Sequence, residues 1–187
     1  MRATSIGLAA AIGLSAAAIG GAASAQSVWY GDKAQACRVV ADEGRSDAAA
    51  LDVCDQALTQ TGLSTHDRAG VYINRGAILI SRRNWESALS DFEAALNIDR
   101  DRGAAHVGKG AYLLGQERFG EVEAEVNRGL QLGTEQPEKA YYIRAMARWA
   151  LDDLTGAYKD FQTAAQIRPN WDEPKRAMAN FITSPAG

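Results

Sequence analysis

Histidine and cysteine are scarce in this chain, and their scarcity excludes several kinds of site. The 187 residues include two histidines and two cysteines, and no H-E-x-x-H, G-x-S-x-G or Cys/His cluster occurs. Such motifs supply the metal ligands and nucleophiles of common hydrolases. His66 and His106 are each predicted to pack or cap rather than to catalyse. A hydrolase that depends on His106 is the disfavoured alternative, so we expect no enzyme activity, no metal and no cofactor.

A phosphate-binding loop is also missing, although one segment comes close to it. Residues 103–110 read GAAHVGKG, which matches G-x4-G-K but has glycine where the motif requires Ser or Thr. No predicted strand precedes this segment, so no scaffold would aim its backbone amides at a phosphate. We therefore reject nucleotide binding and assign the segment to the start of a helix.

Positive charge is not in excess either. The chain has 20 Lys and Arg residues against 23 Asp and Glu residues, which gives a formal net charge of −3. Nucleic acids and anionic membrane surfaces attract proteins with clustered basic residues. This balance argues against both as the main partner. Hydrophobic residues make up 47% of the chain, which is enough to bury a sizeable core.

A long, weakly hydrophobic run lies at the N terminus. Arg2 precedes an Ala/Gly/Leu/Ile run over 6–19, and Ala23-Ser24-Ala25 is a small-x-small cleavage signal. We predict that 1–25 is a secretory signal peptide, cleaved after Ala25. An uncleaved membrane anchor is the alternative, but the run is only weakly hydrophobic and ends at a good cleavage site. The rest of the chain is then exported, with a periplasmic location and no membrane insertion expected.

Residues 69–102 have the pattern of two amphipathic helices joined by a short turn. Their apolar and small residues recur at the spacing of a buried helical stripe. The stripe consists of Tyr72, Gly76 and Leu79 on the first helix and Ala88, Phe92 and Ala95 on the second. The small residues allow the two helices to cross closely, and the large residues interlock beside them. The segment therefore predicts a tightly packed helical pair.

This order of residue sizes resembles the tetratricopeptide repeat (TPR), a helix-turn-helix unit of about 34 residues. The family's aromatic, small, Ala, Phe and Ala positions coincide with Tyr72, Gly76, Ala88, Phe92 and Ala95. One unit cannot bury its own apolar face, so copies are expected on either side. The resemblance implies an all-α fold, a right-handed α-solenoid of helix-turn-helix repeats.

Further copies of the pattern follow along the chain. Ala145, Ala157, Phe161 and Ala164 lie at one constant offset from their counterparts in 69–102. We predict a single domain over 26–187, with repeats at 69–102, 103–136 and 138–171. A degenerate repeat is expected at about 31–66. A capping helix with a polar outer face is expected at about 172–183, because solenoids need a closed end.

The two cysteines fall in the degenerate unit. Cys54 takes the place that Phe92 has in the second unit, and Cys37 lies at the matching level of the partner helix. An exported protein meets an oxidising compartment, so we predict a disulfide between them. Two buried free thiols are the alternative. A redox-active pair is less favoured still, because the spacing is not C-x-x-C.

Function must then come from the surface of the stack. The family's first helices line a concave groove, and the resemblance assigns the matching positions here as partner-binding residues. They are Ile73, Asn74, Ala77, Ile80, Val107, Ala111, Leu114, Lys139, Tyr142, Met146 and Trp149. Most are apolar, which suits a helix or an extended peptide with apolar side chains, and the Asn74 amide can hold a peptide backbone. Met146 and Trp149 have an alternative role, which is to seat the capping helix.

We therefore predict a non-enzymatic protein–protein interaction adaptor or scaffold that binds a protein or peptide partner in its groove. The alternative is a structural or assembly protein that self-associates through the solenoid surface, for example as a homodimer. The repeat is specific for fold and unspecific for function, because the same unit serves many partners.

Overall fold

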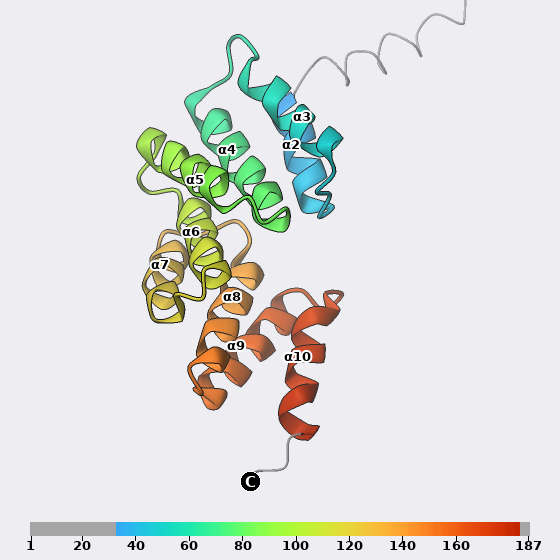
Figure 1. Cartoon of the computed structure of the whole chain (residues 1–187), viewed down its shortest axis with the longest axis vertical. Helices are drawn as coiled ribbons and strands as arrows, with labels where there is room; N and C mark the ends of the chain where they lie inside the picture. The colour runs from blue at the N-terminus through green and yellow to red at the C-terminus, as the bar shows by residue number, and fades with distance from the viewer. Residues whose placement is uncertain (1–32, 184–187) are drawn as a thin grey trace, which may run out of the picture. The chain divides into compact units, whose positions relative to one another are not determined.

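The computed structural model describes the backbone of residues 33–183 and the side chains of residues 33–179. Every regular element in this range is an α-helix, as Figure 1 shows. The predicted signal peptide lies outside the described residues, so the prediction of its cleavage stays a prediction. The all-α class is confirmed for the described part of the chain.

The helices follow one another with short connections. They are α2 (Lys33–Asp42), α3 (Ala48–Leu58), α4 (Thr65–Ser81), α5 (Trp85–Ile98), α6 (Gly103–Gly115), α7 (Phe119–Gln131), α8 (Pro137–Ala150), α9 (Leu154–Ile167) and α10 (Asp172–Thr183). Helices α4 and α5, α6 and α7, and α8 and α9 form the most extensive pairs. The first helix of each pair also contacts the first helix of the next pair, so that α2 contacts α4, α4 contacts α6 and α6 contacts α8. This repeated pairing is a helical solenoid.

The ends of the helices follow from local chemistry. Gly62 (φ 77°) and Gly133 (φ 79°) have positive φ values, which glycine adopts without steric cost, and they follow the ends of α3 and α7. The Ser64 hydroxyl accepts a hydrogen bond from the Asp67 amide and caps α4. Pro137 begins α8, where a missing amide hydrogen is tolerated.

Large and small residues interlock in the core as the size pattern predicts. Phe92 on α5 is 1% exposed, and its counterpart Phe161 on α9 is fully buried. A Cβ atom at Gly76 on α4 would lie 2.6 Å from the Phe92 ring, and one at Gly108 on α6 would lie 2.3 Å from it. Phe92 therefore joins three helices from two successive units.

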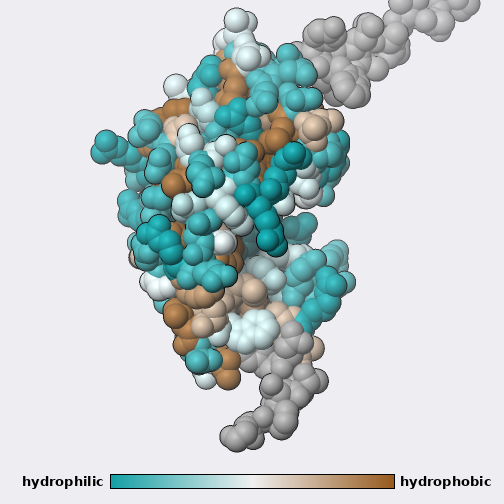
Figure 2. Space-filling model, in the orientation of Figure 1, coloured by the Kyte–Doolittle hydropathy of each residue, from teal (hydrophilic) through white to brown (hydrophobic). Residues whose placement is uncertain are grey.

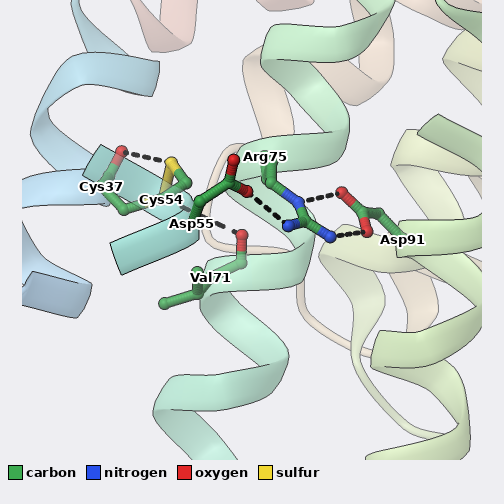
Figure 3. Close-up of a disulfide and its surroundings, with 6 residues drawn as sticks. All are labelled: Cys37, Cys54, Asp55, Val71, Arg75 and Asp91. Atoms are coloured by element: carbon green, nitrogen blue, oxygen red, sulfur yellow. Dashed lines mark hydrogen bonds and ion pairs between the residues drawn. A yellow bond between two sulfur atoms is a disulfide. The ribbon is translucent and has the colours of Figure 1, made fainter. Parts of the chain in front are cut away.

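The first unit, which consists of α2 and α3, has two cysteines in its core where the second unit, α4 and α5, has the ring of Phe92. Cys37 on α2 and Cys54 on α3 are both fully buried, and their sulfur atoms lie 2.04 Å apart, at bonding distance. Figure 3 shows the pair beside α4. Val40, Ala50 and Ala57 pack around it, and Val71 and Ile78 of α4 complete the cluster, so the first unit shares this core with the second. The two sulfur atoms thus take the place of a large side chain in this core.

Replacing both cysteines by alanine should lower the free energy of unfolding by about 3 kcal/mol. The cysteines are 17 positions apart. A disulfide that closes a loop of that size stabilises the folded state by about 3 kcal/mol, because it restricts the unfolded chain. Denaturant unfolding without reductant measures the difference. Reductant should destabilise the natural chain to a similar degree and leave the double variant unchanged. If the free energy of unfolding of the double variant lies within about 1 kcal/mol of that of the natural chain, two buried free thiols are favoured.

Helix α10 closes the other end of the stack. Its Ala177 and Met178 join the core cluster of Phe161 on α9, and Pro174 is buried at its start. Asp172 is the first residue of the helix. Among the described residues, no helix combines the length and hydrophobicity that a membrane crossing requires.

Candidate protein-binding surface

The predicted groove residues lie on the first helices of three successive units, which are α4, α6 and α8. These helices lie side by side, since α4 contacts α6 and α6 contacts α8. Ala77 on α4 is exposed, and Ile73, Ile80, Ala111 and Leu114 are half-buried. Half-buried apolar side chains on neighbouring helices leave part of their surface available to a partner.

One predicted residue does not lie on an open face. Val107 on α6 is only 7% exposed and belongs to the core cluster that Val122 and Val126 of α7 complete. Its methyl group would lie 2.6 Å from a Cβ atom at Gly129. Because α6 and α7 cross closely here, Val107 points into the core between them and does not line the groove.

The predicted residues on α8 pack largely against the end of the stack. The Tyr142 ring lies 4.8 Å from that of Trp171 and 5.5 Å from that of Phe161. Trp149 contacts the Phe161 ring at 6.2 Å, and Met146 belongs to the same cluster as Ala177 of α10. Burial raises the pKa of the Tyr142 hydroxyl. Met146 and Trp149 thus occupy the seat of the capping helix, which is the alternative role that the sequence allows.

Lys139 lies near a contact between the first and fourth units. Gln136, just before α8, donates a hydrogen bond of 2.6 Å to Asp42 at the end of α2, although 94 positions separate them. Burial lowers the pKa of the Lys139 ammonium group, and the charges of Asp42 and Glu138 oppose this shift. The first and fourth units are therefore in contact at this point, and Lys139 belongs to that contact.

The remaining predicted residues form an open strip on α4 and α6. We call this set the α4–α6 strip, and it comprises Ile73, Asn74, Ala77, Ile80, Ala111 and Leu114. Asn74 is half-buried, and its side-chain amide makes no hydrogen bond within the described part of the chain. An amide in this setting offers both a donor and an acceptor to a peptide backbone. The strip combines apolar contact area with one such polar group.

A row of ion pairs on the opposite side of the first helices was missed by the sequence reasoning. Arg75 of α4 donates two hydrogen bonds, of 2.8 and 2.7 Å, to Asp91 of α5. It donates a third, of 2.6 Å, to Asp55 of the preceding unit. Figure 3 shows the guanidinium between the two carboxylates. These hydrogen bonds, led by that of Asp91, raise the pKa of Arg75 despite its partial burial.

The fourth unit repeats this arrangement. Arg144 of α8 donates hydrogen bonds of 2.8 and 2.7 Å to Asp160 of α9. It also bonds Asn127 of the preceding unit. Arg148 donates to the same Asp160 at 3.0 Å and to Glu123. Asp160 is 4% exposed, so its charge is compensated by two guanidinium groups inside the protein.

In the third unit a lysine–glutamate pair takes the place of the arginine–aspartate pair. Lys109 on α6 pairs with Glu125 on α7 at 2.9 Å, and His106 contacts the same carboxylate at 2.8 Å. Burial raises the pKa of Glu125, but the hydrogen bonds from His106 and Lys109 outweigh it and the net shift is downward. Glu125 is half-buried, because α7 turns it toward His106 and Lys109 of α6. His106 is half-buried in this contact, which is the packed role expected of it.

A sequence signal for these pairs exists. Arg75, Lys109 and Arg144 each stand directly before the small residue of a first helix. Asp91 and Asp160 each stand directly before the buried phenylalanine of a second helix. Neighbouring positions on a helix lie about 100° apart, so residues next to a buried stripe flank the interface and can meet across it. The described residues contain no group of three His, Cys, Asp or Glu side chains suited to a metal ion.

The described helices define a helical repeat protein with an apolar strip on its first helices. The fold is TPR-like. The first TPR domain of the human RPAP3 protein is 21% identical over 64% of this chain and 92% of that chain, with a TM-score of 0.56. MamA from Desulfovibrio magneticus RS-1, from residue 41 to its end, is 18% identical over 79% and 82% of the two chains, with a TM-score of 0.52. No family model and no curated protein matches the sequence.

Proposed function

We propose that this protein is a non-enzymatic interaction adaptor that binds an apolar peptide or helix of another protein along the α4–α6 strip. The observation that carries the proposal is the partial exposure of the strip. Ala77 is exposed, and the half-buried Ile73, Ile80, Ala111 and Leu114 on the two adjacent helices keep part of their surface accessible. A row of this kind fits an amphipathic helix or an extended segment, whose apolar side chains bury the remaining surface.

We also propose that the chain acts after export, in the periplasm, once the segment 1–25 has been removed. The small-x-small signal at Ala23-Ser24-Ala25 supports this, and so does the pair of buried cysteines at bonding distance. Mass spectrometry of the protein recovered from the cell envelope tests it. A mature chain that begins at Gln26 and contains the disulfide is the expected result, and an intact Met1 would contradict export with cleavage.

The binding proposal is tested by placing a photo-crosslinking residue at Ala77, in the middle of the strip. A matched control carries the same residue at Ala124, which is exposed on α7. Both positions are alanines on helix surfaces, so neither change removes a core side chain. We expect one discrete crosslinked protein from position 77 in intact cells, and none of it from position 124.

A second pair of variants asks whether the strip is required. Ala77→Arg adds a long charged side chain to the apolar row, and Ala124→Arg makes the same change on α7. The first should abolish capture of the partner and the second should preserve it. If both preserve it, the binding site lies elsewhere. If position 77 crosslinks only to a second copy of the chain, the self-association alternative replaces the adaptor.

A further inference from the structure

An open cleft of about 480 Å³ lies where the first unit meets the second. Residues of α3, α4 and α5 line it. Its apolar floor consists of Leu51 and of Leu79, which is 7% exposed. The charged residues drawn in Figure 3, which are Asp55, Arg75 and Asp91, are among the residues that line it. We call this hollow the α3–α5 cleft, and it does not include any residue of the α4–α6 strip.

The charge around the α3–α5 cleft is unbalanced. Three carboxylates line it, those of Asp55, Glu86 and Asp91, against the single guanidinium of Arg75. Arg75 pairs with Asp55 at 2.6 Å and with Asp91 at 2.7 Å. Glu86 makes no ion pair within the described residues, and it is exposed. The cleft therefore has an excess of negative charge beside an apolar floor.

The chain contains an internal counterpart in which this imbalance is corrected. At the junction of the third and fourth units, Arg144 and Asp160 correspond to Arg75 and Asp91. The residue that corresponds to Leu79 there is Arg148, at the same offset along the chain. Its guanidinium pairs with Asp160 at 3.0 Å and also with Glu123. A second guanidinium thus occupies the fourth unit at the place where the second unit has an open cleft.

We propose that the α3–α5 cleft binds the guanidinium of an arginine side chain that a protein partner presents. Leu51 and Leu79 contact the methylene stem, as long cationic side chains lie along apolar surface. The carboxylates of Glu86 and Asp55 accept hydrogen bonds from the head group. Arginine fits better than lysine because its planar fork matches a carboxylate in a bidentate arrangement. The partner's arginine supplies from outside the charge that Arg148 supplies internally in the fourth unit.

The test uses the blocked tripeptide acetyl-Gly-Arg-Gly-amide as the probe and backbone amide chemical shifts of the full chain as the readout. The matched probe replaces arginine by citrulline, which keeps the shape and removes the charge. We expect the arginine peptide to shift the amides around Glu86, Ser87 and Ser90 in a saturable manner. The citrulline peptide should bind at least about fivefold more weakly, since an ion pair at a partly exposed site contributes about 1 kcal/mol.

Two variants locate the site. Glu86→Gln removes the carboxylate without an ion pair and should weaken binding of the arginine peptide about threefold to tenfold. Glu93→Gln makes the same change at an exposed position of the same helix that does not line the cleft, and should leave binding unchanged. Leu79→Arg introduces the residue of the fourth unit and should abolish the shifts. Glu86→Gln keeps the test valid if Leu79→Arg does not fold.

Several outcomes would overturn the proposal. Absence of saturable shifts at the cleft would do so, as would equal binding of the arginine and citrulline peptides. Equal weakening by Glu86→Gln and Glu93→Gln would reduce the effect to the general negative charge of the surface. Cleft amides that shift with protein concentration alone would assign the cleft to a second copy of the chain. Each of these results is independent of whether the α4–α6 strip binds a partner.

Discussion

Replacing Phe92 by alanine should lower the free energy of unfolding by about 3–5 kcal/mol, the range for removing a fully buried aromatic side chain. The ring is 1% exposed and fills the space that Gly76 and Gly108 leave open on two different helices. Its removal leaves a cavity that α4, α5 and α6 share. Because three helices meet there, the neighbouring side chains cannot close the space without shifting a whole unit.

The matched control is Phe119→Ala at the start of α7. Phe119 is half-buried and packs at the edge of the third unit's core. Its loss should cost about 1–2 kcal/mol, since less apolar area returns to water. Denaturant unfolding of the two variants under identical conditions measures the difference. Equal destabilisation by the two variants would show that the Phe92 ring does not join the units as its burial implies.

Replacing Asp160 by alanine is expected to be about equally destabilising, again by roughly 3–5 kcal/mol. Its carboxylate is 4% exposed and accepts hydrogen bonds from both Arg144 and Arg148. Without it, two partly buried guanidinium groups lose their main counter-charge. The cost is chiefly that of the Arg144 charge, which keeps only the neutral Asn127 amide, because a buried cation without a counter-charge is poorly solvated, whereas Arg148 keeps Glu123.

Asp101→Ala serves as the control for this prediction. The Asp101 side chain is 76% exposed and pairs with Arg128 at 3.4 Å. Solvent screens such a pair, so its loss should cost no more than about 0.5 kcal/mol. In the double variant Arg144→Met/Asp160→Ala, part of the stability should return because one uncompensated charge is removed. A loss for Asp160→Ala as small as that for Asp101→Ala would contradict a buried role for this network.

The fold class could be predicted because it depends on periodicity and size order along the chain. Tyr72, Gly76, Ala88 and Phe92 alternate in volume at helical spacing, and this requires only that two helices cross closely. The burial of Phe92 against Gly76 matches that expectation. The same reasoning from residue spacing was less successful in assigning residues to the groove surface. Val107 occupies a groove position by spacing, yet the close approach of Gly129 turns it into the core.

Contacts between distant units could not be predicted from the spacing of residues in the sequence. The hydrogen bond of Gln136 to Asp42 joins positions far apart in the chain, and it depends on how rotation accumulates from unit to unit. Small rotations at each helix crossing add up along a solenoid, and no local pattern encodes their sum. The covering of Tyr142 and Trp149 is different, because it comes from the adjacent helices α9 and α10.

Local chemistry in the chain was thus sufficient for the helices, their caps and the repeat, since each depends on residues a few positions apart. The tertiary structure decided which of the charged groups beside the buried stripes meet one another. Arg75, Asp55 and Asp91 come from three different helices, and their charges compensate one another only once those helices are packed. Leu79 and Arg148 are equivalent by position, but Leu79 lines an open cleft whereas Arg148 pairs with Asp160. That difference depends on the volume and charge of all the neighbouring side chains, which become neighbours only through folding.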